Sequence, residues 1–296
     1  MSFYKRFLPK LNQPPATCVL PALAQGDSVP KIIHQTYFSE SVPEEIQANI
    51  ARLKTVNPGW DYRFYTDSDI LRFIEENYDA RVLAYFNRIN PAYGAAKADL
   101  FRYLVVYRCG GAYLDIKSST TVALDDVLAA DDRYLLSYWK NKPGEKFEGF
   151  GMHPELDTAT GEFQQWHVIA APGHPFLKAV IETVFANIDR YLPSLHGVGQ
   201  HGVVRVTGPV AYTLAILPLL ALHPHRIVAS ETDLGLQYSI YKKFSHMHIS
   251  KATHYTVLKE PIVFLSAIRR RMSGLVARLQ KINDGMSERL RPASKS

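Results

Sequence analysis

Residues 90–120 read NPAYGAAKADLFRYLVVYRCGGAYLDIKSST. This segment predicts a helix, a double-glycine turn and a buried strand that ends at Asp115. Asp99 and Arg102 are three residues apart, so they share one face near the start of the helix. If the helix and the strand pack side by side, the two carboxylates and the guanidinium can meet at one edge of a sheet.

Strands and helices alternate along the rest of the chain. Apolar runs bounded by turn residues predict strands, and apolar residues spaced by three or four predict helices. The expected strands are 31–37, 62–65, 134–138 and 166–171, and the expected helices are 43–56, a helix capped by Thr66 or Asp67, and 175–192. This order favours an α/β fold with a mostly parallel sheet flanked by helices, in which ligands bind beyond the carboxyl ends of the strands.

Three further segments are interpreted from their composition. Residues 141–164, rich in Gly, Pro and charge, and residues 193–209, with four glycines, are expected to be loops. The longest apolar stretch, 210–222, contains Pro218 and is too short to span a bilayer, so we expect a buried helix there.

Composition sets the broad class of protein. The chain has 296 residues, 47% hydrophobic and 11% aromatic, which excludes disordered and fibrous proteins. Cys18 and Cys109 match no metal or redox spacing and indicate a reducing compartment. The N-terminus has no apolar run long enough for a signal peptide, so a soluble or peripheral protein is expected.

We divide the chain into three parts. Residues 1–26 carry four prolines and form an irregular N-terminal arm, residues 27–266 form the main α/β domain, and residues 267–296 form a basic tail. The tail has eight Lys and Arg against two acidic residues, while the other 26 basic and 26 acidic residues balance, so the formal charge of +6 belongs to the tail.

The tail also has an amphipathic pattern. Its apolar positions recur every three or four residues, at Met272, Leu275, Leu279, Ile282, Met286 and Leu290. The pattern predicts a helix that lies on an anionic membrane surface, packs on a partner, or docks on its own domain. Because the positive charge is confined to the tail and no stacking platform accompanies it, nucleic acid is not an expected partner.

Asp99, Arg102 and Asp115 are the candidate site residues. A carboxylate at the end of a buried strand is energetically costly unless a cation or hydrogen-bond donors contact it. The alternative is that Asp115 is an ordinary surface residue. Asp99 and Arg102 can form a surface ion pair, but the apolar neighbours in this helix leave little solvated face. A carboxylate and a guanidinium fork suit sugar hydroxyls and phosphate, and a divalent ion on a diphosphate would partner Asp115.

The histidines are weaker candidates. His34 lies near the end of the first expected strand, and His254 belongs to a late group with His246 and His248 whose spacing fits no metal motif. The chain has no Gly-rich phosphate loop, serine nucleophile elbow or HExxH motif, which excludes several enzyme classes.

These residues resemble the DXD-containing glycosyltransferases, the family of fungal initiating α-1,6-mannosyltransferases and bacterial capsular or lipopolysaccharide sugar transferases. The similarity covers roughly residues 29–264 and rests on several ordered motifs. The motifs are PKIIHQTY at 30–37, NPGWDYRFYTD at 57–67, an alanine-rich lead into Asp-x-x-Arg and GG-x-Tyr-x-Asp at 95–117, Pro-Gly-His-Pro at 172–175 and Thr-Gly-Pro at 207–209.

The resemblance implies a GT-A type, Rossmann-like fold and sugar transfer from a nucleotide-sugar with retention at the anomeric carbon. Carried over by position, it implies that His34, Gln35 and Thr36 line the nucleotide pocket. It also implies that Thr66 and Asp67 lie near the base or the ribose.

The same resemblance implies that Asp99 and Arg102 hold the donor sugar, that Asp115 contacts the ribose or a metal ion, and that His254 approaches the metal and the diphosphate. The family motif ends on a second aspartate where this chain has Lys117, which cannot bind a metal. Three interpretations are open: Asp115 binds the ion with help from the C-terminal segment, Lys117 points away, or Lys117 itself neutralises the diphosphate. Mn²⁺ or Mg²⁺ is the expected cofactor.

We therefore expect a retaining hexosyltransferase that moves a sugar from a UDP- or GDP-sugar to a glycan or lipid-linked acceptor in bacterial capsule or lipopolysaccharide synthesis. The expected location is cytoplasmic, with the tail as a candidate contact with the inner face of the plasma membrane. The alternative, suggested by Lys117, is a non-catalytic nucleotide-sugar-binding or scaffold protein on a degenerate transferase fold.

Overall fold

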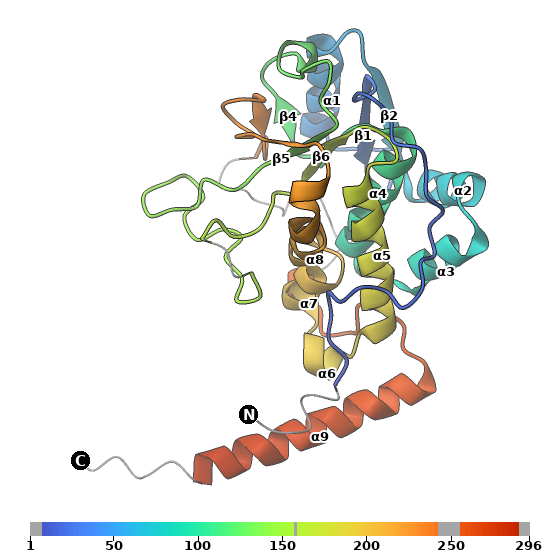
Figure 1. Ribbon diagram of the computed structural model, residues 1–296, viewed down its shortest axis with the longest axis vertical. Helices are drawn as coiled ribbons and strands as arrows, with labels where there is room; N and C mark the ends of the chain where they lie inside the picture. The colour runs from blue at the N-terminus through green and yellow to red at the C-terminus, as the bar shows by residue number, and fades with distance from the viewer. Residues whose placement is uncertain (1–7, 157–158, 242–254, 290–296) are drawn as a thin grey trace.

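A six-stranded mixed sheet in the order β2-β1-β3-β6-β5-β7 forms the centre of the protein (Figure 1). The computed structural model describes residues 8–156, 159–241 and 255–289, the last seven of these as helical backbone alone. The strands of the sheet are β1 (Ile32–Thr36), β2 (Asp61–Tyr65), β3 (Gly111–Leu114), β5 (Tyr134–Leu136), β6 (His167–Ala170) and β7 (Arg226–Ile227). A separate small sheet pairs β4 (Ser119–Thr120) with β8 (Leu236–Gln237).

The strand directions confirm the expected mostly parallel α/β sheet. β1 pairs in parallel with β2 and β3, and β5 with β7, whereas β6 runs antiparallel to β3 and β5. The carboxyl ends of β1 and β3 therefore lie at the same edge of the sheet. The antiparallel register places His167, at the start of β6, opposite Leu114, at the end of β3, so β6 begins at that same edge.

Helices surround this sheet (Figure 1). α4 packs against β3, β6 and α5, and α5 packs against α8. The described α-helices are α1 (Glu44–Val56), α2 (Asp67–Asn77), α3 (Ala80–Arg88), α4 (Gly94–Cys109), α5 (Pro175–Arg190), α6 (Pro193–His196), α7 (Gly199–Val206), α8 (Pro209–Ile216) and α9 (Ala267–Arg289).

The expected start of α2 is confirmed. Thr66 caps the helix and forms a reciprocal capping box with Asp69. The Thr66 hydroxyl accepts from the Asp69 N–H at 3.3 Å, and the Asp69 carboxylate accepts from the Thr66 N–H at 2.9 Å.

α4 is buried on all sides, as a helix with apolar residues around its whole circumference requires. Every residue from 100 to 107 is buried. The turn that follows needs glycine because Gly110 and Gly111 have φ values of +66° and +98°. A Cβ on Gly111 would lie 2.5 Å from the carbonyl oxygen of Ile32, so its absence lets β3 pair closely with β1.

Successive residues of β3 enter two different cores. Tyr113 joins the core built with α4 and α5, whereas Ala112 and Leu114 join the core on the opposite face. This alternation is the period of two that a strand imposes. The side chains at the carboxyl end of β3 are thereby held from both faces of the sheet.

The prediction of a loop over residues 193–209 was wrong, because this segment contains α6 and α7. Val203 and Val206 of α7 are buried in the main core. Their burial outweighs the poor helix propensity of the glycines, which had suggested a loop. The helix α3 was not expected either; Asp79 caps it and Val82 and Phe86 bury its inner face.

The expected buried helix over residues 210–222 is confirmed only for its first part. α8 has buried residues as far as Ile216, whereas the 3₁₀ helix Leu217–Leu222 that follows it has no buried residue and reaches the surface at Leu222, which is 67% exposed. Both belong to a longer helical stretch, Gly199–Leu222, that by length and composition alone is sufficient to cross a membrane. More than half of its apolar window, 56%, is buried inside the protein, as in the core helices of globular proteins.

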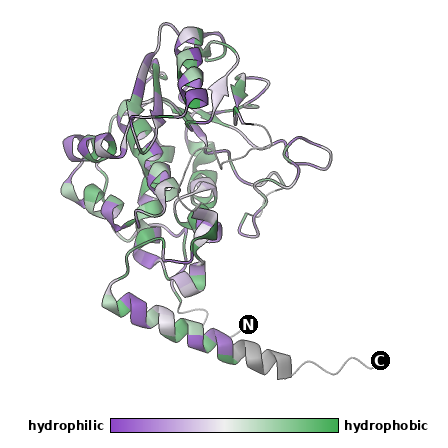
Figure 2. Cartoon of the chain, turned by 180° about the vertical axis from the view of Figure 1, so that it is seen from behind, coloured by the Kyte–Doolittle hydropathy of each residue, from purple (hydrophilic) through white to green (hydrophobic). Residues whose placement is uncertain are grey.

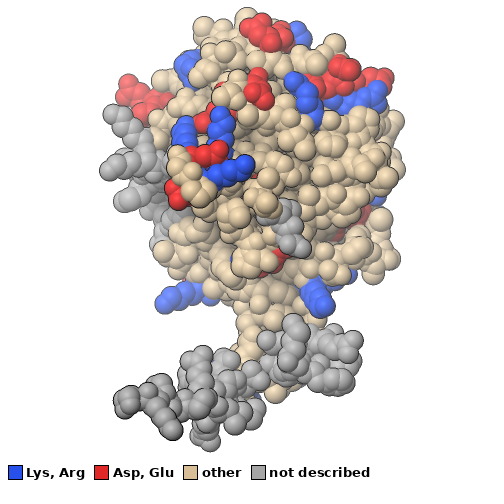
Figure 3. Space-filling view, turned by 60° about the vertical axis from the view of Figure 1, so that its left-hand side comes forward, with Lys and Arg blue, Asp and Glu red and all other residues tan. Residues whose placement is uncertain are grey.

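The described part of the arm, before β1, has no helix or strand. It is held to α5 by Glu182, whose carboxylate accepts from the N–H groups of Val19 at 2.7 Å and Leu20 at 2.6 Å. The described residues 141–156 and 159–164 contain turns and an isolated bridge at Phe163. On the face shown in Figure 3, acidic and basic side chains are interspersed over the upper body, in keeping with the balanced charge outside the tail.

Candidate functional site

Asp99, Arg102 and Asp115 meet at the edge of the sheet where β1 and β3 end. Nη2 of Arg102 lies 3.2 Å from Oδ1 of Asp99 and 3.1 Å from Oδ1 of Asp115. α4 supplies Asp99 and Arg102, one turn apart, and Asp115 directly follows β3. The structure thus brings together the three side chains that the sequence placed in one cluster.

The two residues from α4 are buried and their polar atoms are satisfied. Asp99 accepts from the Thr207 hydroxyl at 2.8 Å and from the Gln165 amide at 3.1 Å. Arg102 donates to the Gln165 carbonyl at 2.6 Å. These bonds offset the cost of burying the two charges, which would otherwise be several kcal/mol.

The electrostatics of the cluster follow from this burial. Burial raises the pKa of Asp99, although Arg102 and the two hydrogen-bond donors oppose the rise. Burial alone would lower the pKa of Arg102, but the groups around it, Asp115 first among them, together outweigh the burial and the pKa is raised. Arg102 is therefore a fixed cation.

Asp115 is the accessible member of the cluster. Its side chain is 24% exposed, against 5% for Asp99 and for Arg102. Its backbone is held on both sides, because its N–H donates to Trp166 at 2.8 Å and its carbonyl accepts from the Gln35 amide at 3.1 Å. Of the three side chains, that of Asp115 is the most open to a ligand at this edge.

Gln35 and Thr36 belong to this same edge. Thr36 shares a 3.1 Å hydrogen bond with the Tyr113 hydroxyl, and the Arg102 guanidinium lies 4.9 Å from the centroid of the Tyr113 ring. Tyr113 thus connects the end of β1 with the cluster.

His34, by contrast, points into the core. It is fully buried, with Nδ1 3.0 Å from the Tyr65 hydroxyl and Nε2 2.9 Å from the Gly110 carbonyl. Because a carbonyl can only accept, Nε2 carries the proton and Nδ1 accepts from Tyr65. Burial lowers the pKa of His34 to about 4, so the ring is neutral at physiological pH. In this structure its surroundings are those of a core residue.

Thr66 and Asp67 lie at the start of α2. Thr66 is engaged in the capping box, and the pKa of Asp67 is raised by burial, with Lys97 of α4 acting in the opposite direction. No described hydrogen bond or ion pair joins either residue to the cluster. A role for them near the base or the ribose stays a prediction.

Lys117 is buried beside the cluster. Its ammonium donates to the Tyr238 hydroxyl at 3.1 Å and lies 4.2 Å from the centroid of the Tyr238 ring. Burial lowers the pKa of Lys117 to about 8, while Asp115 acts to raise it and Arg102 to lower it. Lys117 is therefore turned inward, within the electrostatic range of Asp115, rather than outward into solvent.

The described residues do not form a metal site by themselves. Within the described ranges, no group of three or more His, Cys, Asp and Glu side chains is placed to hold an ion. The two neighbouring carboxylates, Asp99 and Asp115, are already bridged by Arg102. The other expected metal contact, His254, lies outside the described residues.

Sequence reasoning missed four residues that shape this site. Tyr113, Gln165, Thr207 and Tyr238 each contact a predicted site residue. The Thr-Gly-Pro motif at 207–209 was noted without a role for Thr207. Gln165 lies 66 residues from Asp99, and nothing in its local sequence marks the contact.

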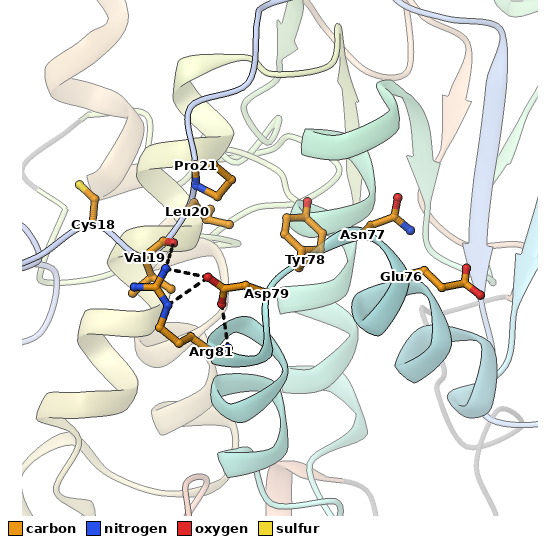
Figure 4. A pocket seen from close by; sticks show the side chains of 9 residues that line it. All are labelled: Cys18, Val19, Leu20, Pro21, Glu76, Asn77, Tyr78, Asp79 and Arg81. Atoms are coloured by element: carbon orange, nitrogen blue, oxygen red, sulfur yellow. Dashed lines mark hydrogen bonds and ion pairs between the residues drawn. The ribbon is translucent and has the colours of Figure 1, made fainter.

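A separate open pocket of about 530 Å³ lies between the N-terminal arm and the link from α2 to α3 (Figure 4). Residues 18–21 line one side, and Tyr78 and Arg81 are on the other. Arg81 is paired with Asp79 at 2.6 Å. None of the predicted site residues lines this pocket.

Comparisons with known proteins bear on this site directly. Residues 43–134 match the family described as the glycosyltransferase sugar-binding region containing the DXD motif. The matched range includes the whole Asp99, Arg102 and Asp115 cluster and Lys117.

Two curated relatives are fungal mannosyltransferases. The chain is 26% identical over 173 residues to inositol phosphoceramide mannosyltransferase 1 of Schizosaccharomyces pombe, a match covering 57% of this chain and 47% of that protein. It is 27% identical over 201 residues to the initiation-specific alpha-1,6-mannosyltransferase of Candida albicans, covering 62% and 51%. The chain thus spans about half the length of these relatives. They give no support to a bacterial capsule or lipopolysaccharide context.

A solved structure, the UDP-bound glycosyltransferase domain from the YGT toxin, matches with a TM-score of 0.51 at 8% identity. The match covers 75% of this chain and 83% of that domain. At this identity the likeness concerns the fold, and it confirms the expected GT-A architecture. Residues 43–134 of this chain are thus similar to the sugar-binding region of the DXD-containing glycosyltransferases.

Proposed function

We propose that this protein transfers a sugar from a nucleotide-sugar donor to an acceptor hydroxyl, with retention at the anomeric carbon. The observation that carries the proposal is the contact of Arg102 with both Asp99 and Asp115 at the carboxyl ends of the strands. In α/β sheets of this kind, this edge is where ligands bind. The family match covers the same residues.

The cluster suits the chemistry of this reaction. When the bond from the sugar to the diphosphate breaks, positive charge develops on the sugar and negative charge on the leaving group. The Asp115 carboxylate can accept hydrogen bonds from hydroxyls of the ribose or the sugar. Arg102 places fixed positive charge beside it, and Lys117 adds positive charge when it is protonated, and both favour departure of the diphosphate. Positioning of the acceptor hydroxyl then supplies the rest of the rate enhancement.

A divalent ion, Mn²⁺ or Mg²⁺, is the cofactor that the family resemblance suggests. The described residues fit a protein-held ion poorly, because they offer one accessible carboxylate, at Asp115, and an ammonium at the second motif position, Lys117. No step of the proposed reaction is therefore assigned to an ion.

The donor and the acceptor are proposed from the relatives. Both relatives are named mannosyltransferases, and one is named for inositol phosphoceramide, a lipid. We infer that a mannose donor and a glycan or lipid-linked acceptor are the first substrates to test. A cytoplasmic site of action, at the inner face of a membrane, is part of this proposal.

The test is donor turnover by the purified chain. GDP-mannose and a panel of UDP-sugars are incubated with Mn²⁺, with Mg²⁺ and with EDTA, and release of nucleoside diphosphate is measured. The expected result is hydrolysis or transfer from one donor, with the anomeric configuration retained by NMR. The matched control is Asp115→Asn, which keeps the shape of the side chain and removes its charge. The absence of both binding and turnover across the panel would contradict the proposal.

A second candidate function is nucleotide-sugar binding without catalysis. Lys117 favours this second function, because the motif of the resembled family has an aspartate at that position. The same experiment separates the two functions. Saturable binding of one nucleotide-sugar with no turnover, in the presence of either metal and of candidate acceptors, would favour the binding protein.

A further inference from the structure

Four of the exposed large apolar side chains in the described part of the chain lie on α9. Ile268, Leu275 and Ile282 are 72%, 59% and 58% exposed, and Met272 is 43% exposed. The first three are seven residues apart and Met272 lies one turn from Ile268, so the four side chains form one stripe along the helix. We call these four residues the α9 stripe.

A different face of α9 packs on the body. Ser273 and Val276 are buried, at 7% and 4% exposed. The Ser273 hydroxyl donates to the Ser194 hydroxyl of α6 at 2.8 Å. Arg269 lies on this same docked face, where its partial burial lowers its pKa. The helix is thus fixed to α6 by one face, while the α9 stripe stays uncovered.

Basic side chains flank the α9 stripe. Arg271 and Arg278 are exposed, seven residues apart, and nearly opposite the docked Ser273 and Val276 at 3.6 residues per turn. No described ion pair involves either arginine. An apolar stripe bordered by unpaired arginines is the arrangement of helices that lie in a membrane interface.

The position of α9 leaves this surface accessible. The helix lies crosswise at one end of the long axis of the molecule, beyond α6 (Figure 1). Hydrophobic and hydrophilic residues alternate along its described part (Figure 2). A flat surface can therefore reach the helix without meeting the sheet domain.

We propose that α9 binds the surface of an anionic lipid membrane through the α9 stripe, with Arg271 and Arg278 at the level of the headgroups. Charge favours lipid over a second copy of this chain. The tail carries six more basic than acidic residues, so pairing two tails would bring like charges together, whereas an anionic surface attracts them. This inference concerns a surface apart from the sugar site and does not depend on the proposed catalysis.

The test is vesicle flotation with the full chain. Vesicles of phosphatidylcholine with roughly 30% phosphatidylserine, which carry a strong negative surface potential, are compared with vesicles of phosphatidylcholine alone. We expect binding to the anionic vesicles and weak binding to the neutral ones. Replacing Ile268, Leu275 and Ile282 together by Ser should weaken the partition coefficient by about tenfold or more. Arg278→Glu should weaken it by about tenfold, since it both removes and reverses a charge.

Matched controls separate surface contact from unfolding and from net charge. Leu222→Ser and Ile227→Ser remove exposed apolar side chains from the main body, and Lys259→Glu makes the same charge change as Arg278→Glu away from α9. These controls should bind vesicles as the wild type does. Unchanged binding by the triple serine variant, or a wild-type dimer in solution that the triple variant converts to a monomer, would overturn the inference. In the second case a copy of the chain, and not lipid, covers the stripe.

Discussion

Nη2 of Arg102 lies 3.1 Å from Oδ1 of Asp115, and this contact joins a helix residue with 5% of its side chain exposed to a strand-end residue with 24% exposed. The helix and the strand are adjacent in sequence, and the double-glycine turn folds one back onto the other. The cluster thus has a buried part, Asp99 and Arg102, which stabilises the fold and fixes the charge, and an accessible part, Asp115, which can contact a ligand. The first two predictions follow from this division.

Asp115→Asn should abolish function at a smaller cost in stability than Asp99→Ala. The amide keeps the size of the side chain but removes the negative charge that accepts from ligand hydroxyls and faces Arg102. We expect turnover, or nucleotide-sugar binding if turnover is absent, to fall by about 100-fold or more. The melting temperature should fall less than in Asp99→Ala, because the side chain at position 115 is 24% exposed and Arg102 keeps its pairing with Asp99. Asp126→Asn, at an exposed carboxylate of the 3₁₀ turn Leu124–Asp126, is the control and should change neither quantity.

Asp99→Ala should lower the free energy of unfolding. It removes the acceptor of the Thr207 and Gln165 donors and one of the two anionic partners of Arg102, all in a buried site. We expect a loss of about 2–4 kcal/mol in urea unfolding. Asp99→Asn should lose less, because its amide oxygen still accepts a hydrogen bond. Wild-type stability in the alanine variant would mean that the buried cluster is not formed as described.

Stability should fall with acid in part because of His34. Its pKa is lowered by burial to about 4 from an ordinary value of 6.5. Between these values the unfolded chain binds the proton and the folded protein does not, so the free energy of unfolding decreases as pH falls through this window. The contribution of this one residue between about pH 7.5 and pH 5 is about 2 kcal/mol.

Urea unfolding of wild type and His34→Gln at the two pH values measures this contribution. The variant is expected to be less stable at neutral pH, because it loses the fit between Tyr65 and Gly110. Its stability should nevertheless fall less steeply with acid. An equal pH slope in the two proteins would show that His34 titrates normally.

Lys117→Asp should increase the effect of metal on nucleotide binding. The substitution removes a buried ammonium and places a second carboxylate two residues after Asp115. This restores the second aspartate of the motif in the resembled family. We expect the ratio of nucleotide affinities with Mn²⁺ and with EDTA to be larger in this variant than in the wild type. Calorimetric titration with UDP and with GDP measures it.

Lys117→Met is the control for this experiment. It removes the same charge without adding a ligand, so its metal ratio should stay below that of Lys117→Asp. Equal ratios of the affinities with Mn²⁺ and with EDTA in the two variants would show that position 117 does not face the ion. The melting temperatures of both variants verify that they are folded.

Local sequence signals accounted for much of the main domain. The strand and helix around the double glycine were predictable because the apolar periods of the two elements differ and the glycines mark their boundary. The start of α2 was predictable from Thr66, since a capping side chain acts within one turn. The prediction failed at residues 193–209, where burial of Val203 and Val206 outweighed the glycines that indicate a loop.

The candidate site was predictable only in part, because local signals predict only those contacts that are made within a short segment. Asp99, Arg102 and Asp115 lie within 17 residues on two packed elements, so their convergence follows from one supersecondary unit. The sequence by itself therefore determined the α/β class, the clustered carboxylates and the amphipathic tail, because periodicity, capping and turn chemistry are local. Tertiary structure alone decided that Gln165, Thr207 and Tyr238 complete the site, that His34 is enclosed in the core, and which face of α9 is docked. Those outcomes depend on contacts between residues far apart in the chain, and no local pattern encodes which distant side chain will share a buried space.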